Sequence, residues 1–256
     1  MTDIELDLDK EFVAGLEKGL MIIEAFALNN GPLTISEAAK ITGHSRSSAR
    51  RSLITLERLG YLETDGKQFR PAPRLLRLAH AYVAASPLAK LVQPSLEALS
   101  ERTQEPSSFA VLDGSDAVFV ARAAARRSLS GGLWIGSRLP AYCTATGRVL
   151  LAALPEGEAL QRLQRMMRQK LTPNTQTEIP ALMEELARVR AKGYALNNEE
   201  LELGVRSIAV PIRNAAGKTL ASVSLATAAS RRTADNMIDT LLPELESVRR
   251  MLGFLI

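Results

Sequence analysis

Short hydroxyl and guanidinium side chains gather between residues 45 and 51, in the run Ser-Arg-Ser-Ser-Ala-Arg-Arg. Serine hydroxyls donate hydrogen bonds to phosphate oxygens, and an arginine can bind the O6 and N7 atoms of guanine through two hydrogen bonds. These residue types are typical of a helix that lies in the major groove of DNA. The candidate DNA contacts are Ser45, Arg46, Ser47, Ser48, Arg50 and Arg51, followed further along by Lys67 and Arg70.

A helix start at Thr144 is the second place where the residue types indicate chemistry. It follows a loop punctuated by Gly and Pro and carries the small residues Thr144, Ala145, Thr146 and Gly147. The first N–H groups of a helix lack partners within it and attract carboxylates. A small-acid site and close packing of the helix on a sheet explain these residues equally well. Arg138 and Arg206 could bind the carboxylate through two hydrogen bonds, or could form structural salt bridges.

Cys143 raises the alternative of an enzyme with a cysteine nucleophile. Such a nucleophile needs a histidine base close by, and both histidines, His44 and His80, precede residue 81. The segment 217–219, Gly-Lys-Thr, resembles the end of a phosphate-binding loop, but Ile212 stands where the first glycine is required. We therefore expect no catalysis and no cofactor. With one cysteine and two histidines, we also expect no metal site.

The elements that would position the first group of residues can be predicted in order. Apolar residues at helical spacing predict a helix over 15–29. Ser36 or Thr34 can cap the next helix, and Glu37 follows Thr34 at the spacing of a capping box. Gly43 suits the left-handed end of that helix, and Ser45 suits the start of a third helix, 45–60. A short helix, a glycine-centred turn and a longer helix indicate a helix-turn-helix.

The third helix has two distinct faces, and a hairpin follows it. At 100° per residue, Ala49, Leu53 and Leu56 fall on a buried face, and Ser47, Arg51 and Arg58 point the opposite way. Residues 61–70 predict a β-hairpin with a two-residue turn at Asp65-Gly66. A hairpin directly after a recognition helix is a wing, so the pattern predicts a winged helix-turn-helix.

The remaining chain interleaves predicted strands with long helices, which is typical of an α+β domain. The predicted strands are 107–112, 117–123, 194–197, 206–213 and 219–228. The predicted helices are 75–85, 88–102, 144–153, 155–169, 180–192 and 233–252.

Composition and charge agree with a nucleic-acid partner. The 256 residues carry 32 Lys+Arg against 28 Asp+Glu, and 46% are hydrophobic, so the chain is long enough for one or two folded domains. Between Lys40 and His80, nine Lys/Arg face three Asp/Glu, a local charge of +6. No apolar run reaches the roughly 18 residues of a membrane span, and the acidic start lacks a signal core. We therefore expect a cytoplasmic protein.

Two segments together resemble the IclR-type bacterial transcription regulators. Segment 33–82 resembles the DNA-binding half of that family, with Arg46-Ser47-Ser48 and Arg51 matching its recognition helix. Segment 136–155, GSRLPAYCTATGRVLLAALP, resembles its ligand-domain signature. The resemblance covers residues 15–250 and is greatest to the subgroup that governs aromatic-acid catabolism through the β-ketoadipate pathway.

The resemblance implies effector contacts at the helix start and on later strands. Carried over by position, they fall on Ala145, Thr146, Asn197, Ser207 and Ser224, to which the residue types add Thr144, Arg138 and Arg206. A further polar position falls on Ala226, which favours a larger, partly apolar acid. We expect a carboxylic acid of the protocatechuate, 4-hydroxybenzoate or β-ketoadipate type.

The predicted protein has two domains. A mainly helical winged helix-turn-helix (15–74) follows an N-terminal arm (1–14), and a linker helix (75–90) joins it to a GAF-like α+β domain for effector binding and oligomerisation (91–256). The predicted partners are an operator in double-stranded DNA, a small carboxylic acid, and further copies in a homodimer or tetramer, because paired half-sites mirror protein symmetry. The alternatives are the Cys143 enzyme and a DNA-binding protein without a ligand.

Overall fold

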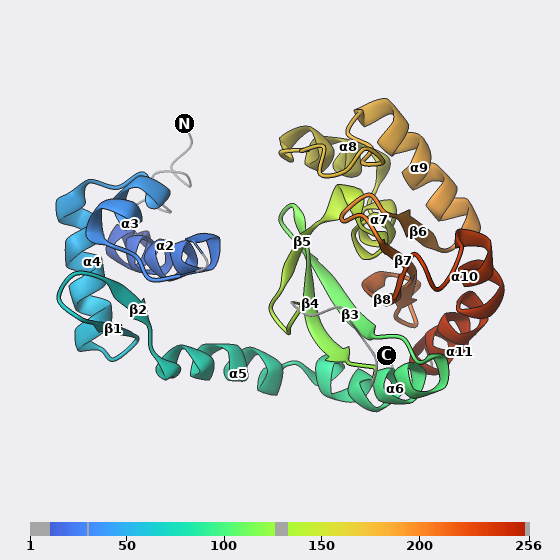
Figure 1. Cartoon of the computed structure of the whole chain (residues 1–256), viewed down its shortest axis with the longest axis horizontal. Coiled ribbons are helices and arrows are strands. Elements are labelled where there is room, and N and C mark those ends of the chain that lie inside the picture. Colours follow the sequence, from blue (N-terminus) through green and yellow to red (C-terminus); the bar gives the residue numbers. More distant parts are fainter. Residues whose placement is uncertain (1–10, 30, 126–132, 254–256) are drawn as a thin grey trace. The chain divides into compact units, whose positions relative to one another are not determined.

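The computed structural model describes residues 11–29, 31–125 and 133–253, and the chain divides into two compact units, residues 1–82 and 83–256. Most of the predicted N-terminal arm, residues 1–10, lies outside the described residues. None of the described helices is long and apolar enough to cross a membrane. Figure 1 shows the elements of each unit.

Unit 1 is a three-helix bundle with a β-hairpin, as predicted for a winged helix-turn-helix. Its core joins Ile22 and Phe26 of the first helix to Leu53 of the recognition helix and to Leu62 and Phe69 of the hairpin. Its elements are α2 (Ala14–Asn29), α3 (Ile35–Thr42), α4 (Arg46–Arg58), β1 (Leu62–Thr64), β2 (Phe69–Pro71), the 3-10 turn η1 (Pro73–Leu75) and α5 (Leu76–Ala85), which extends into unit 2.

Local capping signals determine where α3 and α4 begin and end. The Thr34 hydroxyl accepts a hydrogen bond from the Glu37 N–H, and the Glu37 carboxylate accepts one from the Thr34 N–H, which confirms the predicted capping box. Gly43 ends α3 at φ +71°, a conformation that glycine adopts without strain. Ser45 caps α4 by accepting from the Ser48 N–H at 3.2 Å.

The hairpin turn differs from the prediction. Thr64 pairs with Phe69, so four residues, 65–68, connect the strands instead of two. The Asp65 carboxylate accepts hydrogen bonds from the N–H groups of Lys67 and Gln68, both at 2.8 Å. These bonds lower the pKa of Asp65. The two-residue turn was wrong because this side chain stabilises a wider loop.

Unit 2 is an α+β domain built on one six-stranded antiparallel sheet, in the order β5-β4-β3-β8-β7-β6. One face packs against α6 and α11, and the other packs against α7, on which α8 and α9 pack in turn. The strands are β3 (Ser107–Asp113), β4 (Asp116–Ala123), β5 (Arg138–Pro140), β6 (Ala195–Asn198), β7 (Val205–Arg213) and β8 (Thr219–Ala228). The helices are α6 (Pro87–Thr103), the 3-10 turn η2 (Ala141–Cys143), α7 (Ala145–Ala152), α8 (Glu156–Arg165), α9 (Ile179–Lys192), α10 (Ala234–Thr240) and α11 (Leu242–Gly253).

The helix predicted over 233–252 is two helices. α10 ends at Thr240, and α11 begins at Leu242, with Pro243 in its first turn. Proline has no N–H to donate to the preceding turn, but it fits the first turn of a new helix. The pattern of apolar residues runs through both helices, which is why it indicated a single one.

Candidate DNA-binding and effector sites

The recognition helix α4 is anchored by one face and exposes the other. Ala49, Leu53 and Leu56 are buried against α2 and α3, as predicted. On the outer side Ser47 and Arg51 are exposed, and Ser48 is half-buried. Exposed arginines occur at four positions of the helix, namely Arg46, Arg50, Arg51 and Arg58.

These four arginines are available for an external anion. Within the described part of the chain, no carboxylate forms an ion pair with any of them. A group of free cations on one helix creates a positive potential that attracts phosphate. The outer side of α4 thus combines guanidinium and hydroxyl donors, which is the chemistry needed to contact both the DNA backbone and base edges.

The wing carries the other two predicted DNA contacts, Lys67 and Arg70, and both are exposed. Arg70 Nε donates to the Glu63 carboxylate at 3.0 Å, in an ion pair with both side chains largely in water. Such exposed pairs contribute little to stability, so Arg70 can exchange this partner for a phosphate at small cost.

In unit 2, the start of α7 is fixed tightly to the turn before it. The Thr144 hydroxyl accepts from the Gly147 N–H at 3.2 Å and donates to the Pro140 carbonyl at 3.0 Å. A side chain at Gly147 would overlap the backbone of Ala141. Thr144, Ala145 and Thr146 are all buried. This packing determines the position of the helix start over the sheet.

Three of the predicted effector residues share the sheet face that α7 covers. Asn197 pairs with Ser207, and Ser207 pairs with Ala226, two residues from Ser224. Directly paired residues point to the same face, and so do residues two apart on a strand. Asn197 Nδ2 donates to the Cys143 carbonyl at 2.5 Å, which joins this face to the turn before α7.

The two arginines predicted from charge alone lie elsewhere. Arg138, on the edge strand β5, pairs with Asp113 at 2.6 Å and Asp116 at 3.0 Å. Arg206 pairs with Glu199 at 3.0 Å and donates to two backbone carbonyls. It neighbours Ser207 on the strand and therefore points to the opposite sheet face. The structure brings neither guanidinium together with Ser224.

Arg122 is the cation that the sequence reasoning missed. It pairs with Ser108 across β3 and β4, and Ser108 pairs with Ser224 across β3 and β8. The three side chains therefore share one row on the face covered by α7. Arg122 is half-buried, and burial lowers its pKa. A single charged residue inside the apolar strand 117–123 was the available signal.

Cys143 has the properties of a core residue. It is fully buried, and burial raises the pKa of its thiol to about 11. The thiolate is the reactive form, so a thiol with this pKa is a weak nucleophile at neutral pH. Both histidines belong to unit 1. No group of three or more potential metal ligands occurs among the residues that the structure describes.

The fold and the sites define a class of protein in which a DNA-reading winged helix is attached to an α+β domain. The IclR helix-turn-helix domain matches residues 15–66, and the bacterial transcriptional regulator IclR C-terminal domain matches residues 80–252. The chain therefore belongs to the IclR family of bacterial transcriptional regulators.

Several relatives cover nearly the whole chain. It is 38% identical to the Pca regulon regulatory protein of Pseudomonas putida, over 94% of this chain and 84% of that protein. It is 37% identical to the p-hydroxybenzoate hydroxylase transcriptional activator of Acinetobacter baylyi, over 96% of this chain and 93% of that protein.

Solved structures give the same result for the fold. A chain from Rhodococcus sp. RHA1 is 40% identical with a TM-score of 0.79, over 94% of this chain and 97% of that one. Another match is the inducer-binding domain of the Acinetobacter PobR transcription factor, a double mutant in complex with 3-hydroxybenzoic acid. It is 35% identical with a TM-score of 0.63, over 67% of this chain and 100% of that one.

Proposed function

We propose that this chain is a transcriptional regulator that senses an aromatic carboxylic acid. α4 and the wing bind the operator, through Ser45, Arg46, Ser47, Ser48, Arg50, Arg51, Lys67 and Arg70. The acid binds on the sheet face beneath α7. The observation that carries this proposal is the row Arg122–Ser108–Ser224, a guanidinium in register with two hydroxyls.

The chemistry of this face suits a hydroxylated aromatic acid. Arg122 binds the carboxylate, while Ser108, Ser207 and Ser224 offer hydrogen bonds to ring substituents. Ala209 and Ala226 pair with Ser224 and Ser207 on this face and are small and apolar, which suits an aromatic ring. Relatives named for the Pca regulon and for p-hydroxybenzoate hydroxylase support this class, as does the 3-hydroxybenzoic acid in the PobR domain.

The proposed regulator acts as a homodimer or tetramer, without catalytic activity, in the cytoplasm where its operator lies. One winged domain covers little DNA, and two copies related by a two-fold axis read two half-sites. Light scattering at micromolar concentration should give at least twice the chain mass. A monomer that binds its operator at full affinity would contradict this part of the proposal.

Calorimetry with 4-hydroxybenzoate, protocatechuate, 3-hydroxybenzoate and β-ketoadipate tests the acid site. We expect at least one of the aromatic acids to bind, and Arg122→Gln to weaken it about 10- to 100-fold, the range for a hydrogen bond to a charged group. Arg138→Gln is the matched control and should leave the affinity unchanged. An equal loss in both variants, or no binding of any aromatic acid, would contradict the proposal.

A further inference from the structure

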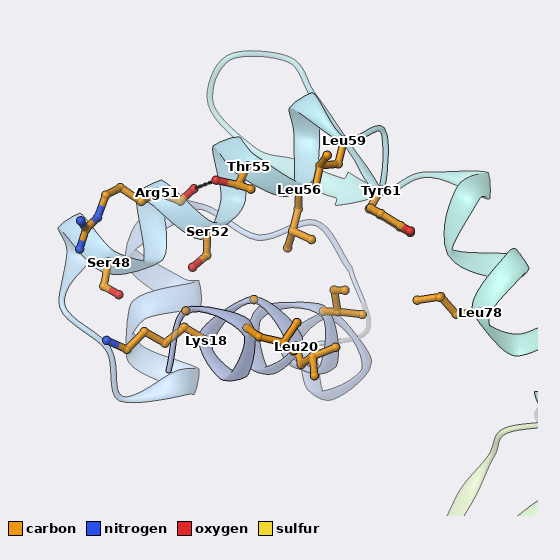
Figure 2. Close-up of a pocket in the computed structure, with 14 residues that line it drawn as sticks. Lys18, Leu20, Ser48, Arg51, Ser52, Thr55, Leu56, Leu59, Tyr61 and Leu78 are labelled. Atoms are coloured by element: carbon orange, nitrogen blue, oxygen red, sulfur yellow. Dashed lines mark hydrogen bonds between the residues drawn. The ribbon is translucent and has the colours of Figure 1, made fainter. Parts of the chain in front are cut away.

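The end of the recognition helix α4 and the start of the linker helix α5 lie close together in unit 1. Between them the chain forms the hairpin β1–β2 and the short turn η1. Leu59, Tyr61 and Leu78 line one groove, and Figure 2 shows Tyr61 between the end of α4 and the first turns of α5. Tyr61 is therefore placed to connect the two helices.

Two backbone hydrogen bonds connect α4 to the start of the linker. The Tyr61 N–H donates to the Leu56 carbonyl, in the last turn of α4, at 2.8 Å. The Tyr61 carbonyl accepts from the Ala72 N–H at 2.9 Å, and Ala72 is buried. Ala72 directly precedes η1, which continues into α5 at Leu76. The two bonds therefore run from the recognition helix through Tyr61 to the linker.

The backbone on either side of Ala72 is stiff. Pro71 and Pro73 flank it in the sequence, and a proline ring fixes its own φ at about −65°. A residue that precedes proline is restricted to extended conformations, and Ala72 has φ −92° and ψ 156°. The segment thus has little freedom to bend between the wing and the linker.

The Arg74 side chain adds a contact between the linker and Tyr61. Its guanidinium carbon lies 5.2 Å from the centre of the Tyr61 ring, within the distance of about 6 Å over which an aromatic face attracts a cation. The same side chain lies against Gly60, where an added Cβ would come within 3.5 Å of Nη1. No carboxylate among the described residues forms an ion pair with Arg74. The stack therefore holds η1, the turn that opens into α5, to the end of α4.

We propose that residues 60–61 and 71–74 form a rigid joint, in which the Tyr61–Arg74 stack is a positioning contact that passes movements of α5 to the recognition helix. The inference rests on the proposed function, because acid bound in unit 2 must act on operator binding in unit 1. Within one chain, α5 is the covalent connection between the two units. A flexible hinge at its start would absorb a movement of α5, whereas a rigid joint moves α4 with it.

The alternative is that the stack only stabilises the wing. Its loss would then weaken operator binding by the same factor with and without the acid, so the ratio of the two affinities would stay the same. We call this ratio the coupling factor. A change in the coupling factor therefore separates positioning from stability.

Full-length variants with matched controls test the joint. Arg74→Gln removes the cation, Tyr61→Leu removes the ring, and the double variant removes both. Tyr61→Phe keeps the ring, and Arg77→Gln removes an exposed cation of α5 outside the joint. The operator affinity of each is measured by fluorescence anisotropy without acid and with saturating 4-hydroxybenzoate or protocatechuate.

The expected change is a loss of coupling in the variants that break the stack. Arg74→Gln and Tyr61→Leu should each reduce the coupling factor about 2- to 5-fold, the size of an exposed cation–π interaction. The double variant should lose no more than either single variant, because both remove the same contact. Tyr61→Phe and Arg77→Gln should keep the coupling factor of the unchanged protein.

Hydrogen exchange followed by mass spectrometry tests the joint without acid or DNA. Loss of the stack should speed deuterium uptake in residues 72–82, because the linker then opens more often from the end of α4. The two control variants should take up deuterium at the rate of the unchanged protein.

Each of the other outcomes would overturn the inference. Unchanged uptake in Arg74→Gln and Tyr61→Leu would exclude the joint. Faster uptake with an unchanged coupling factor would mean that the stack is only structural, and an equal loss of coupling in Arg77→Gln would assign the effect to charge alone. An unchanged protein without coupling to either acid would contradict the proposed function, and the positioning role with it. Faster uptake in the variants would then show that the failure lies in the function and not in the joint.

Discussion

The proposed DNA-binding surface of unit 1 and the proposed acid-binding face of unit 2 are built in different ways. α4 presents its donors from consecutive residues of one helix, between Ser45 and Arg51. The proposed acid-binding face takes residues from five strands, and only strand order and register place Arg122, Ser108 and Ser224 in one row. A contiguous site can be recognised in a sequence, whereas a site across a sheet must be assembled first.

The two regions also differ in how tightly they are packed. The outer side of α4 is exposed, and its arginines have freedom to adjust to a ligand. Every residue from Ala141 to Ala152 is buried, and the start of α7 touches the backbone of the preceding turn. We therefore expect substitutions at the start of α7 to affect stability and those on the outer side of α4 to affect binding.

The largest expected effect is a loss of stability at the tightly packed start of α7. Gly147→Ala should lower the free energy of unfolding by about 3 kcal/mol, because the added methyl group overlaps the Ala141 backbone in a core that cannot relax. Urea denaturation measures the loss. Gly157→Ala, in α8 with nothing within 4 Å of the new methyl, should be neutral or stabilising by about 0.5 kcal/mol. Equal effects would contradict the account of the α7 start.

A binding effect without a stability effect is expected on α4. Arg51→Ala should weaken operator binding by roughly 1–3 kcal/mol if its guanidinium contacts a base, with little change on random DNA. Gel-shift titrations on both duplexes measure this, and the melting temperature should stay the same. An equal loss on operator and random DNA would assign Arg51 to a phosphate instead.

The smallest effect concerns a single hydroxyl of the sheet. Ser224→Ala should weaken the binding of the aromatic acid by about 0.5–1.5 kcal/mol, more if the hydroxyl bonds a charged oxygen. Calorimetry with the acid measures the change. DNA binding in the absence of the acid should stay unchanged, since Ser224 belongs to unit 2. A loss confined to DNA binding would remove Ser224 from the acid site.

Local signals made unit 1 predictable. The capping box of Thr34 and Glu37, the left-handed Gly43 and the Ser45 cap all act within four residues, and the structure confirms each. The hairpin turn failed because the Asp65 side chain, not the Asp-Gly pair, determines the loop. The preference of Asp-Gly for two-residue turns is an average over many hairpins. Here the two hydrogen bonds that the Asp65 carboxylate accepts from the backbone override that preference.

The proposed acid-binding face was only partly predictable, for a physical reason. The strands themselves were found, but their register decides which side chains meet. Arg138 and Arg206 were chosen by charge, and the structure engages both in ion pairs away from Ser224. Arg122 lies in the predicted strand 117–123, whose other residues are apolar, and only its pairing with Ser108 places it in one row with Ser108 and Ser224.

A regulator that senses the acid must couple acid binding in unit 2 to operator binding in unit 1, and the reciprocity of this coupling tests it most directly. The affinity for the acid is measured by calorimetry with and without saturating operator, and the affinity for the operator with and without saturating acid. Coupling requires the same factor in both directions, in the range of about 5- to 150-fold that is typical of allosteric proteins. An acid affinity that does not change when the operator is bound would contradict the account.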